Sequence, residues 1–425
     1  MVQTPHTLLP FLRQLEEQYL RNPPSGAKIV GYLCLSSPVE LLDAVGAIPI
    51  RLMPGSSDAE LRGGRFLSSD SCSFCKAILG GLDRGDMQPD AILGSTTCDQ
   101  MRRNLEIIQR DLKIKTFIFN SPRTADNPFS REFARDELHR LAMEISAWAG
   151  IEISSDKLFD AIARRRNLRQ RLANLVGAHP EGGLRSSNAP TSVSPFFKGG
   201  LRGIIEISGA EFFALMQLYQ TTSLDFFEEH LPEIESRLAK RPSPFQKPPL
   251  RMALLGSCIG EGDDQVINLI EEGGRATVIY DSICTGRRAL REFAGGLPLS
   301  PFFKGGSRGI INPPSPPLEK GGDQTGDPFE ILTSLYHDPI LCPHLLPNER
   351  LFEVAAEEIR ALGVQGVIYK TLKFCHPWGF EARRFKETLG LPFLHLDHDL
   401  SNSAIGQMRT RIAAFIEQLT IGPKR

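Results

Sequence analysis

The feature that most constrains this chain is a short apolar strand that ends on a cysteine and leads directly into a helix. Residues 366–374 read Gly-Val-Ile-Tyr-Lys-Thr-Leu-Lys-Phe, and Cys375 follows them. Valine, isoleucine and tyrosine favour a buried strand, while Pro377 ends it and opens a helix predicted over residues 379–384. Backbone N–H groups and the positive end of the helix dipole meet at this junction. Both favour a thiolate, which is the form of cysteine that binds iron or zinc.

The same order of elements occurs in the first half of the chain. A strand predicted over residues 27–35 contains Cys34 near its end, and a strand over residues 90–94 is followed by Cys98 and a helix over residues 100–112. Strands that alternate with helices at this spacing predict an open parallel sheet with helices on both faces.

The second half repeats the pattern. A strand at residues 251–255 leads to Cys258 in a glycine-rich turn, and a strand at residues 276–280 leads to Cys284. Ligands of open α/β sheets bind beyond the carboxyl ends of the strands. We therefore expect two flavodoxin- or Rossmann-like domains whose strand-end thiols meet in the cleft between them.

The length of 425 residues predicts two or three domains. The expected division is an N-terminal helix (1–26), a first α/β domain (27–127), a helical segment (128–241), a linker (242–250) and a second α/β domain (251–425). A twelve-residue motif at residues 194–205 recurs at 300–311 with one difference. We expect the surrounding inserts, 181–205 and 297–326, to be irregular, exposed and dispensable.

Composition excludes several classes of partner. The formal net charge is −1, so no bulk attraction to nucleic acid or anionic membranes is expected. No apolar run approaches the roughly 20 residues of a membrane span, and no secretory signal is recognisable, so we expect a cytoplasmic protein. The chain has eight cysteines, but a large cytoplasmic protein does not need disulfides, and a reducing compartment would not keep them. The simplest interpretation of each is a small buried apolar residue, but their positions at strand ends argue against this for the set.

Two cysteines form a C-x-x-C pair, Cys72 and Cys75, in a loop that feeds a short helix. Such a pair is compatible with a redox dithiol, half of a zinc site or iron–sulfur ligation, and the pair alone does not choose between them.

Several charged residues are candidates for other roles. Glu40 is expected to cap a helix in a capping box with Ser37, and its place near Cys34 allows an acid/base role. The basic run 164–171 is expected to be a solvated helix face, with phosphate binding as the alternative. Arg287 and Arg288 are candidates for binding anions or for facing water, and residues 395–399 are expected to form a capped, solvated loop.

The motifs together resemble the 2-hydroxyacyl-CoA dehydratase and benzoyl-CoA reductase family, and specifically its D-component. The matching segments are Gly31–Cys34, Cys72–Phe74, Thr97–Asp99, Cys284–Arg287 and Phe374–Pro377. The resemblance covers nearly the whole chain except the two inserts.

Two types of cluster occur in this family. The resemblance implies that a dehydratase-like subunit holds one 4Fe–4S cluster on three cysteines, which here are Cys72, Cys98 and Cys375. A sister group holds an 8Fe–9S double-cubane cluster on six cysteines, which here correspond to Cys72, Cys75, Cys98, Cys284, Cys342 and Cys375. Because all six positions match, the resemblance is closest to the double-cubane group. The chain departs from that pattern at His376 and His344.

The resemblance implies an iron–sulfur reductase that receives low-potential electrons from a separate ATP-hydrolysing activase. It also implies a homodimer, or a heterodimer with a related subunit, acting on a small molecule or an acyl-CoA. One alternative is a subunit that removes water from an (R)-2-hydroxyacyl-CoA. Two others are a zinc-binding structural protein, on Cys72, Cys75, Cys98 and Cys375, and a thiol oxidoreductase on Cys72 and Cys75.

Overall fold

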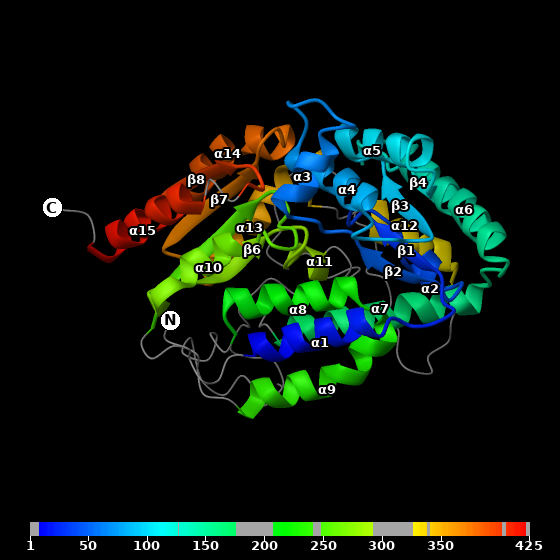
Figure 1. The fold of residues 1–425 in the computed structure, drawn as a ribbon, viewed down its shortest axis with the longest axis horizontal. Coiled ribbons are helices and arrows are strands. Elements are labelled where there is room, and N and C mark those ends of the chain that lie inside the picture. The colour runs from blue at the N-terminus through cyan, green and yellow to red at the C-terminus, as the bar shows by residue number, and fades with distance from the viewer. Residues whose placement is uncertain are drawn as a thin grey trace.

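The computed structural model describes residues 8–125, 127–175, 207–240, 248–291, 326–337, 341–401 and 405–421. Two four-stranded sheets lie in this part of the chain, one in each half, and every strand pair in both is parallel (Figure 1). The predicted α/β fold with open parallel sheets is confirmed.

The first sheet has the strand order β2-β1-β3-β4. Its strands are β1 (Ile29–Tyr32), β2 (Ile48–Arg51), β3 (Ala91–Ser95) and β4 (Lys115–Phe119). The helices between them are α2 (Glu40–Asp43), α3 (Ser57–Gly63), α4 (Ser73–Arg84) and α5 (Asp99–Arg110). All five residues of β3 are buried, as expected of an inner strand covered on both faces.

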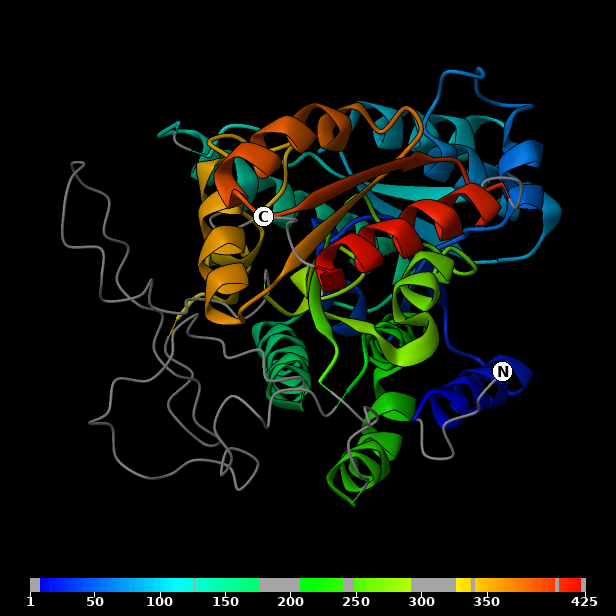
Figure 2. The same ribbon diagram turned by 90° about the vertical axis from the view of Figure 1, so that its left-hand side faces the viewer.

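The second sheet has the equivalent order β6-β5-β7-β8. Its strands are β5 (Leu250–Gly256), β6 (Ala276–Ser282), β7 (Gly366–Leu372) and β8 (Phe393–His398). The accompanying helices are α10 (Gln265–Glu271), α11 (Arg288–Arg291), α12 (Pro328–His337), α13 (Glu349–Ala361), α14 (His376–Leu389) and α15 (Ile405–Ile421). Residues of α10 and α15 cover one face of this sheet, and residues of α13 and α14 cover the other (Figure 2).

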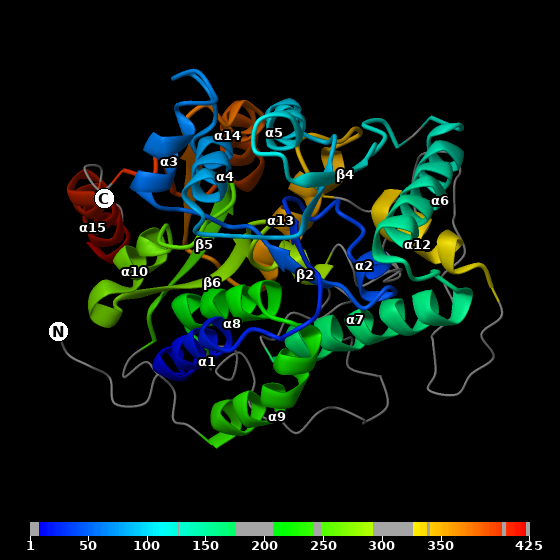
Figure 3. The ribbon, with the colours of Figure 1, turned by 45° about the vertical axis from the view of Figure 1, so that its right-hand side comes forward.

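A helical layer packs below the two sheets. It consists of α1 (Leu9–Arg21), α7 (Ser155–Leu175), α8 (Gly209–Thr221) and α9 (Leu224–Lys240), whereas α6 (Ser130–Ala149) packs beside the first sheet, against β4 and α12. Helix α8 starts in a capping box between Ser208 and Glu211 and contacts both β2 and β6. Figure 3 shows α8 directly beneath the sheets, with α1 and then α9 beyond it. This layer therefore supports both halves of the molecule.

Backbone contacts join the two halves. Pro54 forms a β-bridge with Glu261, and the Glu261 N–H donates to the Met53 carbonyl over 2.5 Å. A Cβ atom on Gly55 would lie 2.4 Å from the Glu261 carbonyl oxygen, so only glycine permits this approach. These contacts hold the loop after β2 of the first sheet against the loop after β5 of the second.

The elements differ from the sequence-based expectations in a few places. Helices α3 and α12 were not predicted, β5 begins at Leu250 inside the expected linker, and β8 runs on to His398 through a segment expected to be a loop. The inserts 181–205 and 297–325 lie outside the described residues, and the domain boundaries stay predictions. Within the described part of the chain, none of the helices has the length and apolarity needed to cross a membrane.

Candidate functional site

Cysteines gather where the two sheets face each other. Five of them follow strands: Cys34 after β1, Cys98 after β3, Cys258 after β5, Cys284 after β6 and Cys375 after β7. Cys72 is the N-cap of α4, and Cys75 lies in its first turn. All eight thiols are free. The expected strand–cysteine–helix arrangement is therefore present in both sheets.

Four thiols form what we call the helix-cap group, which consists of Cys72, Cys75, Cys98 and Cys375. They pack in one apolar cluster that also contains Cys258 and, from the second half of the chain, Leu372 and Leu400. Three of the four cap helices, so their thiols lie at the positive end of a helix dipole.

The thiols of this group affect each other's protonation. Hydrogen bonds from Cys375 and Cys75 hold the pKa of Cys72 well below its ordinary value. The pKa values of Cys75 and Cys375 are raised, first because each donates to Cys72 and then because both are buried. Of the three, Cys72 is thus the thiol that most readily becomes a thiolate.

Hydrogen bonds hold the helix-cap group in place across the boundary between the two halves of the chain. Gln100 accepts from the Cys72 N–H over 2.5 Å and donates through Nε2 to the Phe374 carbonyl over 3.1 Å. The Ser73 N–H donates to the Lys373 carbonyl over 3.3 Å. Phe374 has a φ of 63°, a left-handed conformation that is unfavourable for a bulky residue. The loop before Cys375 is therefore held in a strained conformation by its contacts with the first half.

The other four thiols form what we call the arginine group, which consists of Cys34, Cys258, Cys284 and Cys342. Arg51, at the end of β2, donates through Nη2 to the Cys284 sulfur over 3.2 Å and through Nη1 to the Cys284 carbonyl over 2.6 Å. A hydrogen bond from the Cys258 thiol, followed by the charges of Arg51 and Arg288, holds the pKa of Cys284 well below its usual value. Cys284 therefore becomes a thiolate more readily than Cys34 or Cys258, whose pKa values are raised.

The remaining members connect the two groups. The Cys342 sulfur lies 3.1 Å from Nδ1 of His344. Burial and the nearby Cys342 thiol raise the pKa of Cys34, whose sulfur lies 3.7 Å from Oγ1 of Thr97. The hydrogen bond to Cys284 and then burial raise the pKa of Cys258 well above its ordinary value, and the charge of the nearby Cys72 raises it further. Cys258 thus links the helix-cap group to the arginine group, because it packs with the first and forms a hydrogen bond with Cys284 of the second.

The arrangement does not surround a single ion. Among the residues that the structure describes, no three or more His, Cys, Asp or Glu side chains are placed to hold one metal ion together. An iron–sulfur cluster makes a different demand, because each of its thiolates binds a different iron atom. A chain of thiols in a partly apolar region, with helix N-termini and buried arginines beside it, fits that demand.

Glu40, the first residue of α2, is fully buried. Its carboxylate accepts from Nη1 of Arg169 over 3.1 Å and from the hydroxyl of Tyr336 over 2.5 Å. The expected capping box with Ser37 is wrong, because α2 begins at Glu40 itself and Val39 occupies the N-cap position. The acid/base role of Glu40 stays a prediction.

The basic run on α7 is only partly solvated. Arg165 and Arg169 are both 4% exposed and pair with Asp43 and Glu40, respectively. The expectation of a solvated face is wrong for these two residues. The signal that was missed is their spacing of four, which matches carboxylates three residues apart on the facing helix α2.

Arg287 and Arg288 do not face water, since they are 7% and 3% exposed. Arg288 lies near Cys284 and over the ring of Trp378, with its guanidinium carbon 5.3 Å from the ring centre. Whether these arginines bind a substrate anion stays a prediction.

Sequence reasoning missed a buried charged group beside Cys258. Lys370, in the middle of β7, donates through Nζ to Oδ2 of Asp263 over 2.5 Å and to the Cys258 carbonyl over 2.9 Å. Nε2 of His398 lies 3.7 Å from the other oxygen of Asp263. The solvated loop expected at residues 395–399 is wrong at His398, which is 3% exposed. The available signal was a lysine within an otherwise buried strand.

Comparison with known proteins agrees with this architecture. The sequence matches the family described as 2-hydroxyglutaryl-CoA dehydratase, D-component, over residues 34–300 and 314–419. The chain belongs to this family.

Two relatives support the family assignment. The Escherichia coli (strain K12) protein named "Putative dehydratase subunit YjiM" is 25% identical over 408 residues, which is 93% of this chain and 92% of that protein. The beta subunit of (R)-2-hydroxyglutaryl-CoA dehydratase from Acidaminococcus fermentans is 25% identical over 163 residues, which is 37% of this chain and 43% of that subunit. The family resemblance expected from the motifs is confirmed.

Proposed function

We propose that this member of the family is an iron–sulfur reductase that carries a double-cubane cluster on Cys72, Cys75, Cys98, Cys284, Cys342 and Cys375. The observation that carries the proposal is the continuity of the thiols across both groups. A subunit with a single 4Fe–4S cluster needs only Cys72, Cys98 and Cys375. Of the three further cysteines of the sequence pattern, Cys75 packs in the same apolar cluster as Cys72. Cys284 forms a hydrogen bond with Cys258, which packs against that cluster, and Cys342 lies near Cys34.

Buried positive charge is the second argument. Arg51 is 2% exposed, and within the described ranges it forms no ion pair with a carboxylate. A buried arginine without an anion is costly. Its nearest candidate anion is the Cys284 thiolate, so the site is arranged for negative charge at this sulfur. A thiolate-ligated cluster supplies that charge permanently.

The chain's own residues would orient and protect such a cluster. When bound, the cluster would hold and transfer low-potential electrons. The N-termini of α4, α5 and α14 direct N–H groups towards the ligating sulfurs, Arg51 holds Cys284, and the apolar Leu372 and Leu400 restrict the access of water. We further propose that the electrons come from a separate ATP-hydrolysing activase, because the sequence has no Walker-type phosphate loop.

Metal analysis of the anaerobically purified chain tests this proposal. We expect about eight iron atoms per chain, against about four for a dehydratase-type subunit with one cluster. Cys284→Ala and Cys342→Ala are expected to lose about half of the iron, whereas Cys98→Ala is expected to lose most of it.

Cys34→Ala is the matched control, because Cys34 lies in the same region but outside the six-cysteine pattern, and its iron content is expected to be unchanged. About four irons per chain, unaffected by Cys284→Ala, would support the dehydratase alternative instead. A colourless protein loaded with zinc would reject both.

A further inference from the structure

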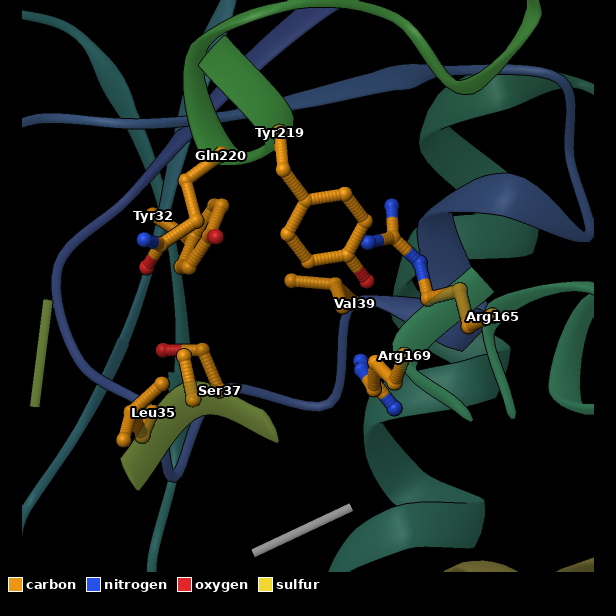
Figure 4. Close-up of a pocket in the computed structure, with 9 residues that line it drawn as sticks. Tyr32, Leu35, Ser37, Val39, Arg165, Arg169, Tyr219 and Gln220 are labelled. Carbon is orange, nitrogen blue, oxygen red and sulfur yellow. The ribbon is translucent and has the colours of Figure 1, made fainter. Parts of the chain in front are cut away.

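Two glutamine side chains join segments that carry thiols, and each uses both ends of its amide. A glutamine amide accepts hydrogen bonds through Oε1 and donates through Nε2, so one side chain can satisfy a donor and an acceptor at the same time. Gln100 lies in the first turn of α5, and Gln220, labelled in Figure 4, lies in the last turn of α8. The first bonds to segments of the helix-cap group and the second to segments of the arginine group.

Gln100 connects the loops of Cys72 and Cys375, which come from opposite halves of the chain. Its Oε1 accepts from the Cys72 N–H over 2.5 Å, and its Nε2 donates to the Phe374 carbonyl over 3.1 Å. Cys72 is the N-cap residue of α4, and the first N–H groups of a helix need partners from outside it. Gln100 supplies one of these partners and ties α4 to the residue before Cys375.

The loop that Gln100 holds is a strained turn. The Cys375 N–H donates to the Leu372 carbonyl over 3.0 Å, which closes a tight turn with Phe374 at its third position. The φ of 63° at Phe374 is one that glycine adopts far more readily. Such strain persists only where surrounding contacts hold it. The hydrogen bond from Gln100 is one of these contacts, so its loss should let the turn relax and Cys375 move.

Gln220 makes the matching contact at the arginine group and is 2% exposed. Its Oε1 accepts from Nη1 of Arg51 over 2.8 Å, and its Nε2 donates to the Thr285 carbonyl over 3.0 Å and to the Met216 carbonyl over 2.9 Å. Arg51 in turn donates to the Cys284 sulfur over 3.2 Å. Gln220 therefore holds together the donor of this sulfur hydrogen bond and the residue that follows the sulfur in the chain.

We propose that Gln100 and Gln220 are positioning residues for the two thiol groups. Gln100 sets the separation between Cys72 and Cys375, and Gln220 sets the place of Arg51 beside its sulfur acceptor. Both act through neighbouring groups rather than as ligands. The inference deepens the proposed function and rests on it for the group that the sulfurs hold, whereas the contacts themselves do not depend on that group.

Amide hydrogen exchange of the full chain, followed by mass spectrometry with fragmentation to single amides, tests the inference. Methionine is about as long as glutamine but lacks both polar ends. We expect Gln100→Met to accelerate exchange at the Cys72 N–H about tenfold, because its acceptor is lost. Exchange at the Ile259 N–H, which donates to Oγ1 of Thr285 over 3.1 Å, should stay unchanged. Gln220→Met should give the opposite pattern.

The two ends of Gln100 can be tested separately, with a variant that also serves should Gln100→Met fail to fold. Gln100→Glu keeps an acceptor for the Cys72 N–H but removes the donor to the Phe374 carbonyl. We expect the Cys72 amide to stay protected, while exchange accelerates about tenfold at the Ser73 N–H, which donates to the Lys373 carbonyl of the turn. Adding Phe374→Gly should restore this protection, because glycine holds the turn without strain, and a failure to restore it would contradict the role of the strain.

Gln109→Met is the matched control, because Gln109 lies on the same helix but is exposed and pairs with Thr116, so exchange at both thiol groups should match the wild type. In the iron-loaded chain, the g values of the electron paramagnetic resonance spectrum should shift in Gln100→Met and stay constant in Gln109→Met. Unchanged g values would overturn the positioning of the sulfurs.

A general loss of stability would accelerate exchange at both groups in either methionine variant, and this result would overturn the inference. Unchanged exchange at the Cys72 N–H in Gln100→Met, or at the Ile259 N–H in Gln220→Met, would do the same for that glutamine. The iron count of the wild type tests the proposed function alone, so the two can fail separately.

Discussion

The two sheets have the same strand order but contribute different chemistry. In each, the chain reverses direction across the sheet between its first and third strands, β1 and β3 in one and β5 and β7 in the other. A cysteine follows each of these four strands, at the position where open α/β sheets bind ligands. The equivalent pairs are Cys34 with Cys258, and Cys98 with Cys375. Each half thus places a cysteine directly after two of its strands, at the same edge of its sheet.

The difference lies in the neighbouring strands. The strand β2 ends on Arg51, whereas its counterpart β6 leads to Cys284, and the arginine donates to that sulfur across the boundary. The inner strand β3 is free of charged residues, whereas its counterpart β7 buries Lys370. The two sheets therefore share a strand order but carry different charged and thiol side chains, and residues of both halves form the candidate site. The following variants test this division.

The largest effect is expected from the buried charge that only the second sheet has. Lys370→Met leaves Asp263 buried without its lysine partner, which should lower the free energy of unfolding by about 3–5 kcal/mol. Denaturant titration measures this loss. The control is Lys373→Met, whose ion pair with Asp399 is half exposed and is worth less than about 1 kcal/mol. Equal losses in both variants would show that the second sheet does not depend on its buried charge.

A smaller effect should separate a glycine near the end of the first strand in one sheet from a glycine near the end of the first strand in the other. Gly256 has a φ of 117°, and a Cβ atom there would lie 1.9 Å from the Lys370 carbonyl oxygen, so Gly256→Ala should cost about 2–4 kcal/mol. At Gly31 the Cβ would meet only the side chain of Leu52, at 2.8 Å, and Gly31→Ala should cost about 1–2 kcal/mol. Thermal unfolding of the two variants gives the order, and a reversed order contradicts the comparison.

The smallest effect concerns pH. Burial, and then the charge of Lys370, lowers the pKa of His398 in the folded protein. Below the unfolded value of about 6.5, the unfolded chain therefore binds the proton first, and stability falls as the pH falls towards the folded pKa. One such group contributes at most about 1.4 kcal/mol per pH unit.

His398→Gln should flatten the dependence of the unfolding midpoint on pH between pH 6.5 and 5, with no change above pH 7.5. Identical profiles for the wild type and the variant would remove His398 from the acid response of the second sheet.

Local sequence signals were sufficient for most of the fold. Short apolar runs followed by helix-starting residues predict β1, β3, β5, β6 and β7 because each signal lies within a dozen residues. Helix α3 has only seven residues, too few for an apolar period to be recognised. The six cysteines of the candidate site were identified through family motifs, and their role as cluster ligands stays a prediction.

The rest depends on partners that are distant in the sequence. Glu40 was expected to bond locally with Ser37, but its carboxylate pairs with Arg169, which is 129 positions away. The role of Lys370 depends in the same way on Asp263, 107 positions away. Burial of Arg165 and Arg169 follows from the packing of α2 on α7. Such contacts are set by tertiary packing, and no window of neighbouring residues contains them.

The backbone links between the halves have a consequence for the proposed electron transfer. Glu261 bonds to Met53, Ser73 bonds to Lys373, and Leu346 exchanges hydrogen bonds with residues 123 and 125. Three separate attachments restrict hinge motion between the halves. Sulfur atoms mounted on such a frame keep their separations when an electron arrives or leaves. A cofactor held there would change its charge with little nuclear rearrangement, which is the condition for rapid exchange with a docked donor.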